Sequence, residues 1–432
     1  MLFASFPSMW MVELAQGARS APREIFVSPS GNDTGPGTSE QPFRTIQHAT
    51  DRVQPGGTVT IRAGTYAEAV RLTKSGSYFG RTITIRSAPG EKVVLDGEGL
   101  APSPAIFSTA GQDHLLIRGI TVRNGVNLGL AVEGSYRVRV ENCRTENTGR
   151  SGVFVDKALD VSVSRCEVTK ACARGGEESV SIKRSSDVVF EDSEVHDTFH
   201  EGIDVKEGSK HVIVRRNRVH HVERQGLYAD AWDADTGHIR FENNVVYDCL
   251  VGLVACTESG GLLHDVDFVG NVVYDCRGPG MMLAKWGSEG MTHRITRVAY
   301  INNTVVNCSG PSKSGGIWAG GMLMENDQAE DVTVMNNVLS GNGYAQLRVS
   351  LNLPPKRIVA KNNLIDGVGE NLTKGNLVRK ARFENAAKKD FRLAAGSPGV
   401  NAGAMSSLIG DKDVAGQPRI RGRVDIGAYE RP

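Results

Sequence analysis

Apolar and polar residues alternate in short segments that recur every 23–28 residues through the middle of the chain. Each segment opens on a glycine, once replaced by Ser179, and its first and third following residues are apolar, as in Gly202-Ile-Asp-Val-Lys. Alternation with a period of two predicts a half-buried β-strand whose intervening residues face away from the core. The segments begin at Gly129, Gly152, Ser179, Gly202, Gly226, Gly252 and Gly280.

A second pattern repeats one polar residue followed, two positions later, by an apolar one. It begins at Asn217, Asn244, Asn271, Asn303, Asn337 and Asn363, and Ser193, Cys166 and Cys143 continue the same column toward the N-terminus. An amide that repeats in register beside buried positions indicates an asparagine ladder, in which each side chain bonds to the next coil. We therefore expect these asparagines to be structural and not catalytic.

The two patterns together predict an all-β fold, a single right-handed parallel β-helix over residues 23–432. Three features favour a solenoid: the strands are short, the repeat is 23–28 residues long, and helical periodicity is absent. A propeller would need hairpin turns, and a leucine-rich repeat would show regular leucines. Because each coil buries its apolar face only against its neighbours, the array forms one continuous domain.

Both ends of the chain carry sequence motifs that resemble those of a known group of proteins. The first runs from Phe-Val-Ser-Pro-Ser-Gly-Asn-Asp-Thr-Gly at residue 26 to Ala-Gly-Thr-Tyr at residue 66, and the second includes Val-Asp-Ile-Gly-Ala-Tyr-Glu at residue 424. They resemble secreted β-helix polysaccharide lyases and glycosidases, family 9 polysaccharide lyases included. The resemblance implies an extracellular or periplasmic protein that acts on a polysaccharide or oligosaccharide. It also implies an N-terminal cap at 23–66, with a short helix near Thr45–Val53, and a closing segment at 385–432.

Composition narrows the possible partners. The 50 basic and 49 acidic residues give a net charge of +1, which argues against a general nucleic-acid or membrane-surface binder. No stretch is long and apolar enough to span a bilayer. Residues 1–22 are mildly apolar and are interpreted as a possible leader segment, although Pro7 and Glu13 interrupt them. The seven cysteines are expected to be small buried hydrophobes, not disulfides, and the oligomeric state is not indicated.

Ionisable residues gather at the outward positions of three consecutive coils. Adjacent coils lie about 4.8 Å apart, so outward residues at equivalent positions form columns. The charged and phenolic members are Lys183, Asp204, Lys206, Tyr228 and Asp230. We interpret this patch as a candidate active site. The alternative is a solvated face with cross-strand ion pairs, for instance between Lys206 and Asp230.

Acidic residues just before the strands add candidate metal ligands. Glu178, Glu201 and Asp204 offer hard oxygen donors, which suit Ca²⁺. The run Glu201-Gly-Ile-Asp204 resembles the acidic-Gly-x-Asp signature of family 9 lyases, and this implies Ca²⁺ held by acids of adjacent coils with a lysine base one coil on. The position expected for that lysine is Tyr228, which is a departure from the family pattern.

The leading hypothesis is Ca²⁺-assisted β-elimination on a uronate-containing polysaccharide. Such a lyase needs a cation against the uronate carboxylate, a base for the C5 proton and an acid for the leaving oxygen. Tyr228 is a candidate base or acid if a neighbouring lysine lowers its pKa, and Lys206 is the substitute base. The candidate substrate-binding residues are Lys183, Arg184, Trp232 and Arg224.

Three alternatives remain open. Asp204 and Asp230 are expected about 8 Å apart from strand spacing and rise, within the range of about 6.5–9.5 Å typical of inverting glycosidases. A uronate C5-epimerase would use the same constellation, although the Asp-Pro-His signature of alginate epimerases is absent. The third alternative is a non-catalytic carbohydrate-binding or structural β-helix, whose patch charges pair off among themselves.

Overall fold

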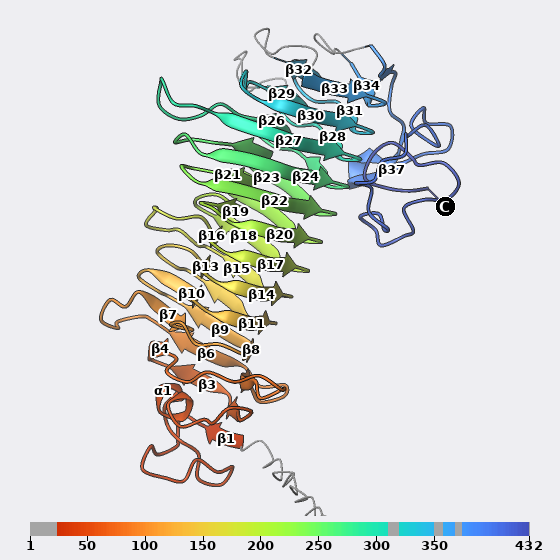
Figure 1. Cartoon of the computed structure of the whole chain (residues 1–432). Coiled ribbons are helices and arrows are strands. Elements are labelled where there is room, and N and C mark those ends of the chain that lie inside the picture. The colour runs from red at the N-terminus through yellow and green to blue at the C-terminus, as the bar shows by residue number, and fades with distance from the viewer. Residues whose placement is uncertain (1–23, 310–318, 350–356, 368–373, 432) are drawn as a thin grey trace, which may run out of the picture.

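The computed structural model describes residues 24–309, 319–349, 357–367 and 374–431, and the possible leader at 1–22 lies outside them. The chain winds into a stack of coils from the N-terminus to the C-terminal region (Figure 1). Nearly all strand pairs are parallel and join one coil to the next. The predicted parallel β-helix is therefore confirmed. No helix of the described residues has the length and apolarity needed to cross a membrane.

One side of the solenoid is a 13-stranded parallel sheet in which every strand comes from a different coil. Its strands are β1 (Glu24–Val27), β2 (Thr58–Ile61), β5 (Ile83–Ser87), β8 (Leu115–Arg118), β11 (Tyr136–Glu141), β14 (Leu159–Ser164), β17 (Ser186–Glu191), β20 (Lys210–Arg215), β22 (Asp235–Glu242), β24 (Leu262–Val269), β27 (Arg294–Ile301), β30 (Glu330–Met335) and β33 (Ile358–Lys361).

The glycine-led segments form a second side. Its strands are β4 (Val70–Arg71), β7 (Ala105–Ser108), β10 (Leu128–Glu133), β13 (Val153–Asp156), β16 (Val180–Lys183), β19 (Ile203–Lys206), the later parts of β21 (Arg218–Asp230) and β23 (Val245–Cys256), β26 (Met281–Leu283), β29 (Met322–Met324) and β32 (Leu347–Val349).

The segments that follow the asparagine column form a third side. Its strands are β3 (Gly64–Tyr66), β6 (Val93–Asp96), β9 (Ile120–Arg123), β12 (Arg144–Glu146), β15 (Glu167–Thr169), β18 (Glu194–Thr198), the earlier parts of β21 and β23, β25 (Val272–Tyr274), β28 (Thr304–Val306), β31 (Val338–Ser340), β34 (Leu364–Asp366) and β35 (Leu377–Val378). Because β21 and β23 run through both sides, the second and third sides belong to one 22-stranded sheet.

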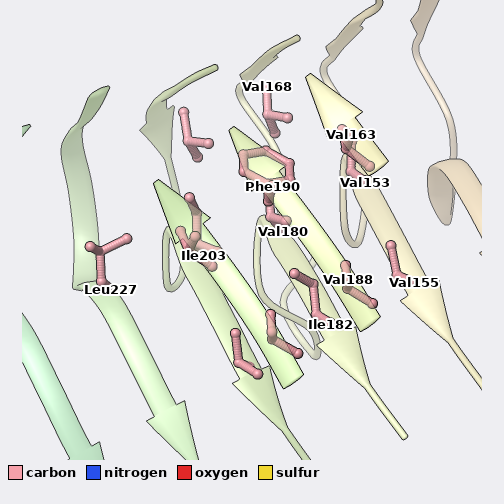
Figure 2. Packing of buried hydrophobic residues seen from close by; sticks show 14 of the residues in the cluster. Val153, Val155, Val163, Val168, Val180, Ile182, Val188, Phe190, Ile203 and Leu227 are labelled. Atoms are coloured by element: carbon pink, nitrogen blue, oxygen red, sulfur yellow. The ribbon is translucent and has the colours of Figure 1, made fainter. Parts of the chain in front are cut away.

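The core is a column of aliphatic side chains enclosed by the three sides. Figure 2 shows Val180 and Ile182 of β16 among the valines and isoleucines of neighbouring coils, with Phe190 of β17 close by. Val180 and Ile182 are the first and third residues after Ser179, which are the apolar positions of that alternating segment, and both are fully buried. The alternation therefore assigned the inward face correctly.

The asparagine column is held by side-chain hydrogen bonds that run from coil to coil. The Nδ2 group of Asn244 donates to Oδ1 of Asn271 at 3.0 Å, and that of Asn271 donates to Oδ1 of Asn303 at 3.0 Å. The Asn271 amide also donates to the Phe241 carbonyl at 3.0 Å, so its polar atoms are satisfied inside the core. All seven cysteines are buried and free, as predicted.

The two ends differ in how they meet the solenoid. Helix α1 (Ile46–Thr50) lies at the N-terminal end, is shorter than predicted, and buries Ile46 and Ala49. The C-terminal segment forms the antiparallel pair β36 (Phe383–Asn385) and β37 (Asp390–Leu393), joined by a 3₁₀ turn at Ala386–Lys388. Instead of only closing the end, as the sequence suggested, this segment lies along the side of the last coils (Figure 1). Leu408 and Ile409, for example, pack against the cluster formed by Val269, Ala299, Ile301 and Met335.

Candidate functional site

Strand register places the predicted columns side by side. Asp204 of β19 is opposite Ser181 of β16 and Tyr228 of β21. In the same strands Lys206 is opposite Lys183 and Asp230. The outward charged residues of three coils therefore share one face, as the period of the sequence predicted.

This face is much less exposed than the sequence suggested. Asp204 and Asp230 are each 1% exposed, and Tyr228 is 3% exposed. Acidic residues of the preceding turns reach over the strands, as shown by the 2.8 Å ion pair between Glu178 and the Lys206 ammonium. The alternative of a solvated face is therefore wrong: the patch is a buried polar cluster, since turn and strand side chains cover one another.

Asp204 is the group whose surroundings are the most incomplete. Neither of its carboxylate oxygens accepts a hydrogen bond from the part of the chain that the structure describes, although the side chain is fully buried. The Lys206 ammonium lies 3.7 Å from Oδ2, outside hydrogen-bond range. Burial raises the pKa of Asp204 well above its usual value, and Glu178 and Asp230 add to this effect against the attraction of Lys206. Oε2 of Glu178 is buried without a partner as well.

Lys206 is the cation at the centre of the cluster. Burial opposes its charge, but Asp204 and Glu178 outweigh burial and raise its pKa. Lys206 is therefore a protonated ammonium at neutral pH, which does not suit the base role expected from the sequence. Its direct ion-pair partners are Glu178, Asp204 and Glu207, and the predicted pair with Asp230 is replaced by that with Glu178.

Tyr228 also differs from its expected role. Its hydroxyl donates a hydrogen bond to Oε1 of Glu258 at 2.5 Å, and its ring packs edge-on against Trp286. Burial raises the pKa of Tyr228 well above the usual value, and nearby carboxylates act in the same direction. The condition set for its role, a pKa lowered by a neighbouring lysine, is therefore not met, and the phenol is a neutral donor.

Asp230 is the group best poised for proton transfer. Burial raises its pKa to about 7, against the 2.8 Å hydrogen bond that the Trp232 backbone N–H donates to Oδ1. A carboxyl that titrates near neutral pH can serve as a general acid or base. Trp232 is 40% exposed, and the Lys206 ammonium lies 5.6 Å from the centre of its ring. Trp232 therefore offers an apolar surface beside the buried acids.

The remaining predicted binding residues are engaged by acids. Lys183 lies 3.8 Å from Glu207, and Arg184 forms a 2.7 Å ion pair with Asp156. Arg224 lies 3.0 Å from Oε1 of Glu201, the third predicted metal ligand.

The predicted metal trio is not fully assembled. Among the described residues, the one group of three metal-ligating side chains whose donor atoms all lie within 4.8 Å of one another is elsewhere in the fold. Glu178, Glu201 and Asp204 share one face, but Glu201 is committed to Arg224. The donors with free oxygens are Asp204 and Glu178.

Sequence reasoning missed Glu258 and Glu207, which complete the charge pattern. Glu258 accepts from Tyr228, and Glu207 pairs with both Lys183 and Lys206. Glu207 directly follows Lys206, the last residue of β19, and Glu258 lies two positions after Cys256, the last residue of β23. A search that continues from the strand positions into the following turns therefore finds both residues.

A groove lies among the turns of the preceding coils. Gly125, Gly149 and Arg174 line a cavity of about 210 Å³ with Asn124 and Asn147. These residues belong to the turns between the third and second sides, as do Glu178 and Glu201 on later coils. The groove therefore lies in the same column of turns as these acidic residues, on earlier coils.

Two family models match the chain. A Pel9A-like, right handed beta helix region matches residues 25–173, and a right handed beta helix region matches residues 105–263. The first match ends five residues before Glu178, whereas the second spans the whole cluster. The fold and the matches together show a right-handed β-helix protein similar to carbohydrate-active proteins, which confirms the resemblance seen in the sequence.

Two curated proteins match shorter parts. An uncharacterized protein YwoF of Bacillus subtilis is 35% identical over 121 residues, which is 26% of this chain and 26% of YwoF. Pectate lyase PEL9 of Emericella nidulans is 39% identical over 84 residues, which is 19% of this chain and 20% of the lyase. The chain thus spans about a quarter and a fifth of the length of these relatives.

Solved structures match over most of the chain. Pectate lyase Pel9A superposes with a TM-score of 0.58 at 17% identity, over 96% of this chain and 97% of its own. XylC in complex with xylose gives 0.59 at 13% identity, over 95% and 98%. A rhamnogalacturonan lyase gives 0.54 at 15% identity, over 81% and 89%. At these identities the superpositions show a shared fold.

Proposed function

We propose that this protein is a polysaccharide lyase that cleaves a uronate-containing polymer by β-elimination with the help of Ca²⁺. The observation that carries the proposal is Asp204, a fully buried carboxylate with no hydrogen bond to either oxygen. A buried carboxyl without donors is costly to ionise unless a cation compensates its charge, and the raised pKa of Asp204 reflects that cost. The similarity to proteins named pectate lyase supports the same reaction class.

The unsatisfied oxygens also separate this proposal from a purely structural patch. Lys183, Arg184 and Arg224 each pair with an acid, as a non-catalytic β-helix would predict. A patch built only for stability would leave no buried carboxylate without a donor. Asp204 and Oε2 of Glu178 break that rule on adjacent coils, and hard oxygen donors of this kind suit Ca²⁺.

In this mechanism Asp204 and Glu178 hold the cation, and the chain's own groups move the protons. A bound Ca²⁺ would neutralise the uronate carboxylate and make the C5 proton more acidic. Asp230 accepts that proton at Oδ2, because its pKa is about 7 and its Oδ1 is held by the Trp232 N–H. Tyr228, whose hydroxyl burial keeps protonated, turns its one hydrogen from Glu258 to the leaving oxygen and donates it there.

Lys206 and Trp232 bind the sugar in this proposal. The Lys206 ammonium attracts a uronate carboxylate, and the exposed Trp232 ring beside it provides a stacking surface. The groove lined by Gly125, Gly149 and Arg174 offers the path for the rest of the polymer. The expected extracellular or periplasmic location stays a prediction.

The test is ultraviolet absorbance of unsaturated uronate products on a panel of acidic and neutral polysaccharides, with Ca²⁺ or with chelator. We expect an absorbance rise that chelation removes and that Asp204→Asn abolishes. Asp187→Asn, an exposed site on the 13-stranded sheet, is the matched control and should keep full activity. Full activity of chelated enzyme, or products without an unsaturated end, would refute the proposal.

A second candidate is an inverting glycosidase, favoured by the pKa of about 7 at Asp230, which suits a general acid. Asp204 would then be the base that activates water. This function predicts new reducing ends without an absorbance rise, loss of turnover in both Asp204→Asn and Asp230→Asn, and no effect of chelator.

A further inference from the structure

A second cluster of possible ligands lies on the 13-stranded sheet, away from the acids described above. His238 belongs to β22, and His264 and Asp265 belong to β24, the strand of the next coil. One possible ligand atom of each residue lies within 4.8 Å of those of the other two. Nδ1 of His264 is 2.6 Å from Oδ2 of Asp265, and Nδ1 of His238 is 3.8 Å from the same oxygen.

We propose that His238, His264 and Asp265 form a binding site for a first-row transition metal ion such as Zn²⁺. A set of two imidazoles and one carboxylate suits these ions better than it suits Ca²⁺ or Mg²⁺. Three protein ligands leave a fourth position for water or for an oxygen of another molecule. This site is independent of the proposed lyase function.

The residues around the three donors hold them close together. Nε2 of His264 lies 2.8 Å from Oδ1 of Asp235, and Nδ1 lies 2.6 Å from Oδ2 of Asp265, so each ring nitrogen faces a carboxylate oxygen. A metal ion would take the place of the hydrogen between Nδ1 and Asp265, while Asp235 keeps its contact with Nε2. A carboxylate behind a ligating histidine is the usual second partner of zinc-bound imidazoles. His238 stacks on His211 of the preceding coil, with ring centres 5.0 Å apart and planes 16° from parallel.

The backbone fixes the site as firmly as the side chains do. Gly237 and His264 are paired in the parallel register of β22 and β24, so the two histidines come from adjacent coils of a continuous sheet. His264 is 12% exposed at its side chain, whereas His238 is 48% exposed and lies open to solvent. A metal therefore has both a buried anchor and an access route.

Arg297 of β27 is the cation that occupies part of this site without metal. It donates to both oxygens of Asp265, at 2.6 and 2.8 Å. A metal ion must share Oδ2 of Asp265 with this guanidinium, which opposes binding of a second positive charge. Removing Arg297 should therefore tighten metal binding, a result that a metal bound elsewhere would not give.

The experiment is calorimetric titration of Zn²⁺ into chelator-washed, tag-free full-length protein, with Co²⁺ absorbance as a second readout. We expect one saturable site, a loss of affinity of about tenfold or more in His264→Ala and in His238→Ala, and tighter binding in Arg297→Ala. His211→Ala is the matched control, because it removes a neighbouring histidine that contributes no ligand, and it should keep the site. Absence of saturable binding, or equal affinity in His264→Ala, would overturn the proposal.

Discussion

Replacement of Asp230 by asparagine gives a direct measure of how the buried cluster affects stability. In an unfolded chain an aspartate titrates near pH 3.9, whereas in the fold burial raises the pKa of Asp230 to about 7. The folded protein thus holds this proton more tightly than the unfolded chain. The stability that results is complete below about pH 4 and is lost as the pH rises through about 7.

The size of the effect follows from the same two pKa values. One pKa unit corresponds to about 1.4 kcal/mol, so ionisation of Asp230 lowers the free energy of unfolding by on the order of 4 kcal/mol between about pH 4 and 8. Asparagine has nearly the same shape and keeps an oxygen for the Trp232 N–H. Asp230→Asn should therefore be less sensitive to pH and should gain stability relative to wild type as the pH rises.

The assay is urea denaturation with chelator at several pH values, comparing the pH dependence of wild type and variant. Asp235→Asn is the control, because against the effect of burial Lys210 and His264 hold the pKa of Asp235 below its usual value. That variant should lose the opposite, stabilising contribution of an ionised carboxylate. Equal pH dependence of wild type and Asp230→Asn would refute the argument.

Three further predictions concern other parts of the molecule. Lys206→Met leaves Glu178 without its cation and should cost about 3–5 kcal/mol in unfolding free energy, measured by denaturation at pH 7; a loss below about 1 kcal/mol would contradict the central role of Lys206. Asn271→Leu breaks the hydrogen bonds to Asn303 and to the Phe241 carbonyl and should cost about 1–3 kcal/mol for each buried partner left unpaired, seen as a lower melting temperature. Trp232→Ala should weaken substrate binding with little change in melting temperature, because its ring is 40% exposed; unchanged binding would remove it from the site.

Much of the fold was predictable because a parallel solenoid repeats the same local rules. Alternation identified the inward residues, such as Ile203, and the coil period placed Asp204 opposite Tyr228 without any structure. The asparagine column was visible for the same reason, since each member occupies an equivalent turn. In such a fold, sequence spacing converts directly into strand register.

The chemistry of the site was less predictable, because it depends on how long side chains fold back. From the sequence, Lys206 was a candidate base, and Tyr228 was a candidate base or acid if a neighbouring lysine lowered its pKa. In the structure, Lys206 is an ammonium between carboxylates, and burial raises the pKa of Tyr228. Burial and charge pairing decide the protonation states, and neither is encoded in the spacing of residues along the chain.

The sequence by itself therefore determined the architecture, the inward face and the columns of residues that share the outward face. These follow from the period of two along a strand and the regular step between coils, both of which are local properties. The tertiary structure alone decided that Asp204 is buried without a hydrogen-bond donor, that Glu201 is held by Arg224, and that His238 and His264 converge on Asp265. Those outcomes depend on side-chain conformations and on solvent exclusion, which arise only when several coils pack together.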